Sequence, residues 1–194
     1  MSLLVTSAAG AGYGNILAFA DNGELVGTFG DDPRIVDPRG LGIDPVDRLL
    51  FINSGSNRIL ALDRNGKVVR ATGSVEGLNP GGGNLGPDGR YHVGLRSERT
   101  IMAYARQLDR PGEYFLPPHI VPFSRGFAFG ADGALFLASG SEHPFGVANA
   151  VTTVREYDRA DGRLVRVLLP NDGVRFQKPR GLRFGPHGQL YCVA

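Results

Sequence analysis

The stretch Arg39–Asn53 reads RGLGIDPVDRLLFIN, and its plan recurs three more times along the 194-residue chain. Each copy is a short apolar segment, a turn rich in Gly, Pro and Asp, and a second apolar segment. The other copies are GGGNLGPDGRYHVGL at Gly81–Leu95, RGFAFGADGALFLAS at Arg125–Ser139 and RGLRFGPHGQLYCVA at Arg180–Ala194. They begin 42 to 55 residues apart, which is the spacing of a repeat built from one supersecondary unit.

A second strand–turn–strand pattern completes the unit. It reads NRILALDRNGKVV from Asn57, RTIMAYARQLDRPGEYF from Arg99 and TVREYDRADGRLVRV from Thr153, and NILAFADNGELVGTF from Asn15 repeats it near the N-terminus. Asn-Gly and Asp-Gly between apolar runs are typical of β-hairpins, because Gly adopts a positive φ without steric cost. Glycine or proline interrupts every window that could form a helix. The sequence therefore predicts an all-β propeller with blades of four antiparallel strands.

The predicted blades span approximately residues 3–29, 39–70, 81–116, 125–169 and 180–194, in one propeller domain or fragment. The first range holds only the second to fourth strands of a blade, and the last range holds only the first two. Closing a four-bladed ring would leave Leu190–Val193 as a surplus strand. We therefore expect a partial propeller of about four blades, cut from a six-bladed ring. Uncovered blade faces invite association, so we expect the chain to self-associate or to be marginally stable.

The stretch 37–68, DPRGLGIDPVDRLLFINSGSNRILALDRNGKV, resembles an NHL repeat. Its Pro-x-Gly motif is Pro38–Gly40, and its polar loop contains Ser54, Gly55, Asn57 and Arg58. Two features depart from the pattern: Asn53 replaces the usual Asp, and the other units lack the Asn-Arg loop. The resemblance implies six blades and a wider group with gluconolactonase-like and streptogramin-lyase-like enzymes. Those enzymes hold metal ligands or an acid–base His and Glu around the channel, and none of these residues can be matched here. A WD40 propeller is disfavoured because the chain has no Trp.

Candidate ligand-binding residues lie where two sets of loops open on one face of a propeller, around its channel. Arg39, Arg125 and Arg180 share one position in three units, with Gly81 in the fourth. They are able to attract an anionic ligand, or to tie neighbouring blades together. We favour the tie, because a residue that recurs at the same position of several repeats is usually architectural.

The other loops on this face supply Asn53, Asn57, Ser139, Glu142 and His143. A long loop on one face of a repeat array is often a binding surface, and the loop after Ser139 is the longest. Glu142 and His143 offer a carboxylate and an imidazole, which is a weak signal for a metal-ligand pair or an acid–base pair. No catalytic residue is identified.

The composition limits the function classes. The net charge is +2 without any run of Lys or Arg, so nucleic acid is not an expected partner. No apolar stretch is long enough to span a membrane, and the start lacks the pattern of a signal peptide, so we expect a cytoplasmic protein. We predict a scaffold that binds a protein or small-molecule ligand on the channel face. The alternative is a lactonase or streptogramin-type lyase, with calcium, magnesium or zinc as its cofactor.

Overall fold

A computed structural model describes residues 3–10, 13–75, 77–139, 153–170 and 179–193. Every regular element within these ranges is a β-strand, and every strand pair is antiparallel. The described residues contain no helix with the length and apolar character needed to cross a membrane.

The strands form five sheets, and each sheet follows chain order. The first has β1 (Leu3–Gly10), β2 (Tyr13–Phe19) and β3 (Leu25–Thr28); the second has β4 (Leu41–Ile43), β5 (Leu50–Ser54), β6 (Arg58–Leu62) and β7 (Val68–Ala71). The third has β8 (Pro80–Leu85), β9 (Tyr91–Leu95), β10 (Thr100–Tyr104) and β11 (Glu113–Tyr114); the fourth has β12 (Ser124–Phe129), β13 (Leu135–Ser139), β14 (Thr153–Tyr157) and β15 (Leu164–Leu169). The fifth has β16 (Gly181–Phe184) and β17 (Leu190–Val193).

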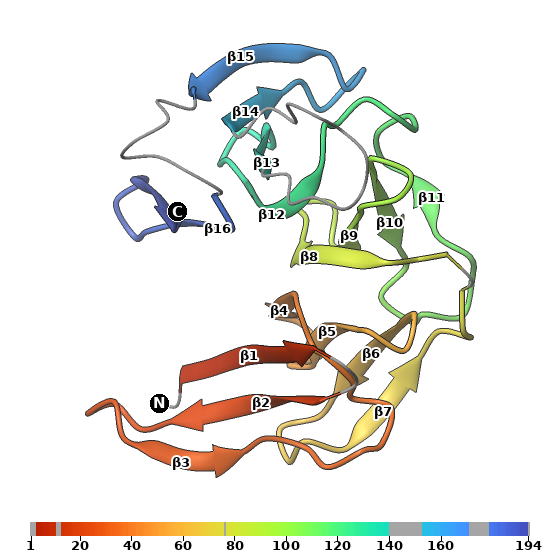
Figure 1. Cartoon of the computed structure of the whole chain (residues 1–194), viewed down its shortest axis with the longest axis vertical. Coiled ribbons are helices and arrows are strands. Elements are labelled where there is room, and N and C mark those ends of the chain that lie inside the picture. The colour runs from red at the N-terminus through yellow and green to blue at the C-terminus, as the bar shows by residue number, and fades with distance from the viewer. Residues whose placement is uncertain (1–2, 11–12, 76, 140–152, 171–178, 194) are drawn as a thin grey trace.

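The sheets are arranged as an arc around a central space (Figure 1). The strands β1, β4, β8, β12 and β16 lie nearest the middle, and the first and fifth sheets form the two ends of the arc. Within the described ranges, no strand of one repeat joins the sheet of another. This is the arrangement of propeller blades, so the predicted all-β propeller is confirmed.

Glycine and aspartate shape the turn between the first two strands of a blade. Gly89 and Gly133 have φ values of 75° and 85°, in the left-handed region that favours glycine. The carboxylates of Asp88 and Asp132 accept hydrogen bonds from the backbone N–H two residues later, at 3.1 and 3.0 Å. The Asp-Gly signal in the sequence therefore has a local cause in each turn.

The core lies between neighbouring sheets. All five residues of β5 and all five of β9 are buried, because each strand has a sheet on both faces. Phe51 of β5 stacks on Tyr91 of β9 with ring centroids 5.2 Å apart. In contrast, β17 at the end of the arc alternates, and its Tyr191 and Val193 are 60% and 67% exposed.

Each inner strand after β1 starts with a β-bulge, in which two of its residues lie opposite one residue of the next strand. Arg39 and Gly40 both bond to Asn53, and Arg180 and Gly181 both lie opposite Val193. The register also gains one residue between Pro80 and Gly83 on β8 and between Ser124 and Phe127 on β12. The recurring Arg-Gly pair of the sequence is therefore the bulge itself, with Gly81 and Gly82 in its place on the third sheet.

The second residue of the bulge must be glycine because the next sheet lies against it. A Cβ on Gly40 would clash with the backbone of Gly83, and a Cβ on Gly82 would clash with the backbone at Arg125 and Gly126. Glycine therefore lets the inner strands approach closely and brings the bulged residues together around the channel.

Candidate ligand site in the central channel

The inner strands line an open cavity of about 910 Å³ to which all five sheets contribute. Its walls combine the apolar side chains of β1, β12 and β17 with backbone from the glycine-rich strand β8. Five arginines line it: Arg39, Arg96, Arg125, Arg180 and Arg183. No aspartate or glutamate among the described residues lines it. The cavity is large enough for a small organic molecule, and arginine is the charged residue type of its described lining.

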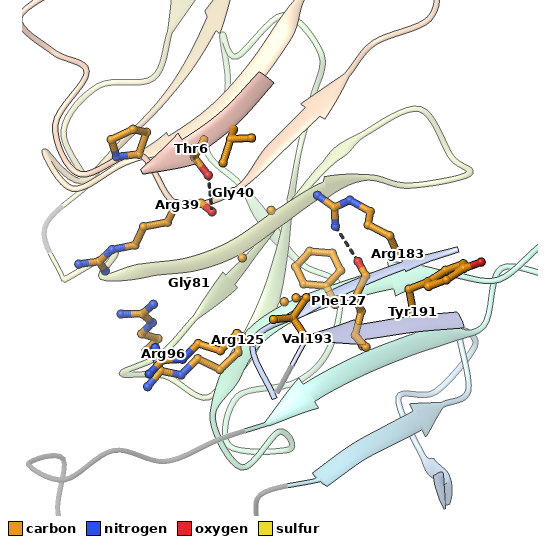
Figure 2. Close-up of a pocket in the computed structure, with 18 of the residues that line it drawn as sticks. Thr6, Arg39, Gly40, Gly81, Arg96, Arg125, Phe127, Arg183, Tyr191 and Val193 are labelled. Carbon is orange, nitrogen blue, oxygen red and sulfur yellow. Dashed lines mark hydrogen bonds between the residues drawn. The ribbon is translucent and has the colours of Figure 1, made fainter. Parts of the chain in front are cut away.

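Three of the five arginines are those that the sequence placed at the channel. Arg39, Arg125 and Arg180 each precede the glycine of their bulge, so the same local geometry brings all three to the cavity. Figure 2 shows Arg39 and Arg125 directed to the same end of the site, together with Arg96.

The third sheet supplies its arginine from a different strand. A Cβ on Gly81 would lie 2.6 Å from the carbonyl oxygen of Ser124, so the backbone leaves no room there for a side chain. Nε of Arg96, which directly follows β9, lies 3.4 Å from that Cβ position. Arg96 therefore takes the place that an arginine at position 81 would have. The alignment of repeats did not predict Arg96 as a cavity residue, because Arg96 follows the second strand of its blade and the other three arginines precede the first. The one indication in the sequence is that the third unit has Gly81 where the others have arginine.

Two of these cations share one aromatic ring. The guanidinium carbons of Arg96 and Arg125 lie 5.8 and 4.8 Å from the ring centroid of Phe123, which is only 5% exposed. A cation over a phenyl face is attracted by the ring quadrupole. Phe123 therefore contacts two positive groups of the cavity wall at the same ring.

Arg39 ties two sheets together. Its Nη1 donates to the carbonyl oxygen of Pro80 at 3.0 Å, and Oγ1 of Thr6 donates to the Arg39 carbonyl oxygen at 3.2 Å. The first bond is the blade-to-blade contact that the architectural interpretation describes. It uses one of the five N–H donors of a guanidinium.

Arg183 of β16 lies apart from Arg39, Arg96 and Arg125 (Figure 2). It donates to the carbonyl oxygens of Leu182 and Leu41, at 2.8 and 3.2 Å. The second bond joins the fifth sheet to the second, and Arg183 has no counterpart in the other repeats.

The structure places three other predicted residues, Asn53, Ser139 and Asn57, away from the cavity wall. Asn53 is buried at the end of β5, where its Nδ2 donates to the carbonyl oxygen of Gly81 at 3.1 Å. Ser139 is buried opposite Ser124. Asn57 has a φ of 57° and its carbonyl oxygen accepts from the N–H of Val75, so it shapes the turn after β5. Glu142 and His143 lie outside the described residues.

A buried polar pair lies behind the glycine strand. The hydroxyl of Tyr91 and the amide of Asn53 both approach the side of Gly83, a residue of the cavity wall. Burial raises the pKa of Tyr91, so its hydroxyl stays protonated at neutral pH. The only chemistry this pair offers is hydrogen bonding. Among the described residues, no group of three or more His, Cys, Asp or Glu side chains is placed to hold a metal ion.

Comparison with known proteins identifies the fold. No family model and no curated protein matches the sequence. Among solved structures, virginiamycin B lyase from Staphylococcus aureus matches with a TM-score of 0.62 at 17% identity, over 92% of this chain and 56% of that one. A streptogramin B lyase matches with 0.58 at 16% identity, over 92% and 68%. A protein of unknown function from Bacteroides caccae matches with 0.64 at 15% identity, over 99% and 65%.

At sequence identities this low, the structural matches establish the fold and nothing about function. The lyases are six-bladed propellers, and the chain spans 56% and 68% of their lengths, as expected for part of a six-bladed ring. The resemblance to the wider group of streptogramin-lyase-like propellers is confirmed at the level of the fold. The narrower resemblance to NHL repeats remains a resemblance of sequence.

Proposed function

We propose that this propeller is a binding module whose central channel holds a small molecule. The observation that carries the proposal is the cavity of about 910 Å³, to which every sheet contributes. Small-molecule sites are mostly concave, partly apolar and supplied with a few polar groups, and this cavity has each property.

A channel-filling variant tests the proposal. Val193 lines the cavity and is 67% exposed, so Val193→Trp adds bulk inside the channel with little strain. Val46 has the same exposure, lies in the turn between β4 and β5, and does not line the cavity, so Val46→Trp is the matched control. A small-molecule library is screened for compounds that raise the melting temperature.

The proposal expects compounds that stabilise the wild type and Val46→Trp but not Val193→Trp. A screen in which every stabilising compound acts equally on both variants would place binding elsewhere. A protein partner would engage the loops around the channel, and its binding would tolerate Val193→Trp.

The enzyme alternative is a lyase or lactonase activity, and fold similarity to virginiamycin B lyase favours the lyase. Fold alone does not choose the function. A direct assay incubates the protein with quinupristin in the presence and absence of magnesium. Quinupristin is the compound in the solved structure of a catalytically inactive virginiamycin B lyase. Reversed-phase chromatography would show consumption of quinupristin that Val193→Trp, Glu142→Gln or His143→Gln abolishes. Unchanged quinupristin would leave the binding module as the proposal.

A further inference from the structure

The first blade has one strand fewer than the second, third and fourth blades. Its described sheet is β1–β2–β3, whereas each of those blades has four strands. The run ILAF at residues 16–19 of β2 matches ILAL at residues 59–62 of β6. Thr6 of β1 lies opposite the first residue of ILAF, and Asn53 of β5 lies opposite the first residue of ILAL. β1 is therefore the second strand of its blade, and among the residues that the structure describes no strand pairs with its other edge.

The contact between the first and second blades supports this correspondence. Oγ1 of Thr6 donates to the carbonyl oxygen of Arg39 at 3.2 Å. In the same way, Nδ2 of Asn53 donates to the carbonyl oxygen of Gly81 at 3.1 Å, and Gly81 has the position of Arg39 in the next repeat. The first blade therefore packs on the second as the second packs on the third. The channel side of β1, which borders the central space (Figure 1), corresponds to the place that β4 has beside β5.

The backbone of β1 offers hydrogen-bonding groups to that place. In the second blade, the N–H of Asn53 donates there to the carbonyl oxygen of Gly40 at 3.3 Å. In the first blade, the carbonyl oxygen of Ile16 accepts from the N–H of Phe29, on the β3 side of β2. Because backbone groups alternate along a strand, Thr6, opposite Ile16, directs its N–H and C=O away from β2. Thr6 also lines the open cavity, so this edge is accessible as a template for another strand.

The inner strands of the other blades show which segment fits such an edge. A Cβ on Gly82 would clash with the carbonyl oxygen of Arg125 in the next blade. A Cβ on Gly126 would clash with the carbonyl oxygen of Arg180 in the same way. A segment beside β1 would meet the carbonyl oxygen of Arg39 at the equivalent place, so it needs a glycine there.

From these observations we propose that β1 binds an extended, glycine-containing segment of a partner protein, which joins the first sheet as its inner strand. Residues 125–130, RGFAFG, are an example of the pattern that fits. The described inner strands of a second copy are already paired in their own sheets, so the segment comes from a different protein. Backbone hydrogen bonds to the edge provide affinity, and the close approach at glycine provides specificity. The inference goes beyond the proposed function, because a small molecule in the channel does not need to pair with a strand.

Hydrogen exchange of single amides, measured by NMR on the whole chain, tests the inference. The probe is a synthetic peptide with the sequence of residues 125–130 and blocked ends. Leu4 lies two residues before Thr6 and faces the same edge of β1. We expect excess peptide to slow exchange of the Leu4 and Thr6 amides by about tenfold or more, because both gain a strand partner. The Glu113 and Tyr114 amides of β11, on the outer side of the third blade, should change by less than about twofold.

Modified peptides serve as matched controls for strand pairing. In the fourth blade, the N–H of Gly130 donates to the carbonyl oxygen of Ala134. By alternation the N–H of Ala128 also points to β13, whereas that of Phe129 points to the channel. A peptide N-methylated at Ala128 should therefore bind about tenfold or more weakly, and one N-methylated at Phe129 should bind within about twofold of the original. The peptide with Gly126→Ala should also weaken by about tenfold or more, because its Cβ meets backbone.

Three results would overturn the inference. The first is no added protection of the Leu4 and Thr6 amides when the unmodified peptide is in large excess. The second is equal binding of the peptides N-methylated at Ala128 and at Phe129, which would indicate contact without strand pairing. The third is protection of the Thr6 amide that rises with the concentration of the chain alone, which would assign this edge to a second copy.

Discussion

A buried histidine makes the stability of this propeller depend on pH. His92 of β9 is fully buried, and its ring lies edge-on to Phe115 and Phe129 with centroids 4.7 and 4.9 Å away. Its Nδ1 is 3.1 Å from the carbonyl oxygen of Arg90. Burial lowers the pKa of His92 from 6.5 to about 4, and the Asp88 carboxylate opposes part of that effect. The folded protein therefore keeps this imidazole neutral at pH values where an unfolded chain protonates it.

The sign and the magnitude follow from this difference. Between pH 6.5 and 4 the unfolded state binds a proton that the folded state does not, so the free energy of unfolding decreases as the pH falls. Each unit of pKa difference is worth about 1.36 kcal/mol, so the complete loss is about 3 kcal/mol. About 2 kcal/mol of it should appear between pH 7 and pH 5, where the Asp88 carboxyl remains ionised because its pKa is lowered.

Urea unfolding at pH 7, 6 and 5 measures this loss, with His92→Phe as the variant. The equivalent position on β13 is Phe136, so the repeat itself indicates that a phenyl ring fits this site. We expect His92→Phe to lose most of the decrease between pH 7 and 5. His187→Gln, at an exposed turn between β16 and β17, should retain it. An equal decrease in the wild type and His92→Phe would refute the argument that burial of this ring controls the pH dependence.

Two further substitutions test the packing, and a third tests self-association. Gly126→Ala should lower the free energy of urea unfolding by about 1–3 kcal/mol, because its Cβ would clash with the backbone of the fifth sheet, whereas Gly73→Ala, with open space around it, should cost less than about 0.5 kcal/mol. Arg106→Gln should cost about 1–3 kcal/mol in the same assay, because Nε of Arg106 lies 3.0 Å from a carboxylate oxygen of the fully buried Asp44. Val26→Asp should reduce the self-association expected from exposed apolar strands, with sedimentation velocity as the measurement, because Val26 is 69% exposed on β3.

Most of the fold was predictable because its signals are local. An Asp-Gly turn needs only a glycine that accepts a positive φ and an aspartate that bonds two residues ahead, and both features occur at Asp88–Gly89. The burial of β5 and β9 followed from nearly continuous apolar runs, which are typical of strands covered on both faces.

The site was only half predictable because its geometry depends on contacts between blades. The recurrence of Arg39, Arg125 and Arg180 identified the channel end, since equivalent positions of a repeat meet around one axis. The replacement of a side chain at Gly81 by Arg96 depends on the carbonyl oxygen of Ser124 in the next sheet. No pattern within one repeat contains that information. Asn53 was predicted to bind a ligand because it is polar and lies next to a loop. The structure buries it against the inner strand of the next blade, which its own repeat does not indicate.

The architectural and ligand-binding interpretations of the arginines make different predictions about stability without ligand. If an arginine only ties blades together, its removal destabilises the protein. If the cluster serves an anion, its members repel one another until the anion arrives, and removing an exposed member relieves that repulsion. Arg39, with its bond to Pro80, should follow the first pattern, so Arg39→Gln should lower the free energy of unfolding by about 0.5–1.5 kcal/mol. Urea unfolding of Arg180→Gln without ligand distinguishes the two interpretations at a second bulge: a similar loss of stability indicates a tie between blades, and an unchanged or higher stability indicates a site for an anion. If both patterns occur, the repeated Arg-Gly pair has two roles: its glycine lets neighbouring inner strands pack closely, and its arginine lines the cavity.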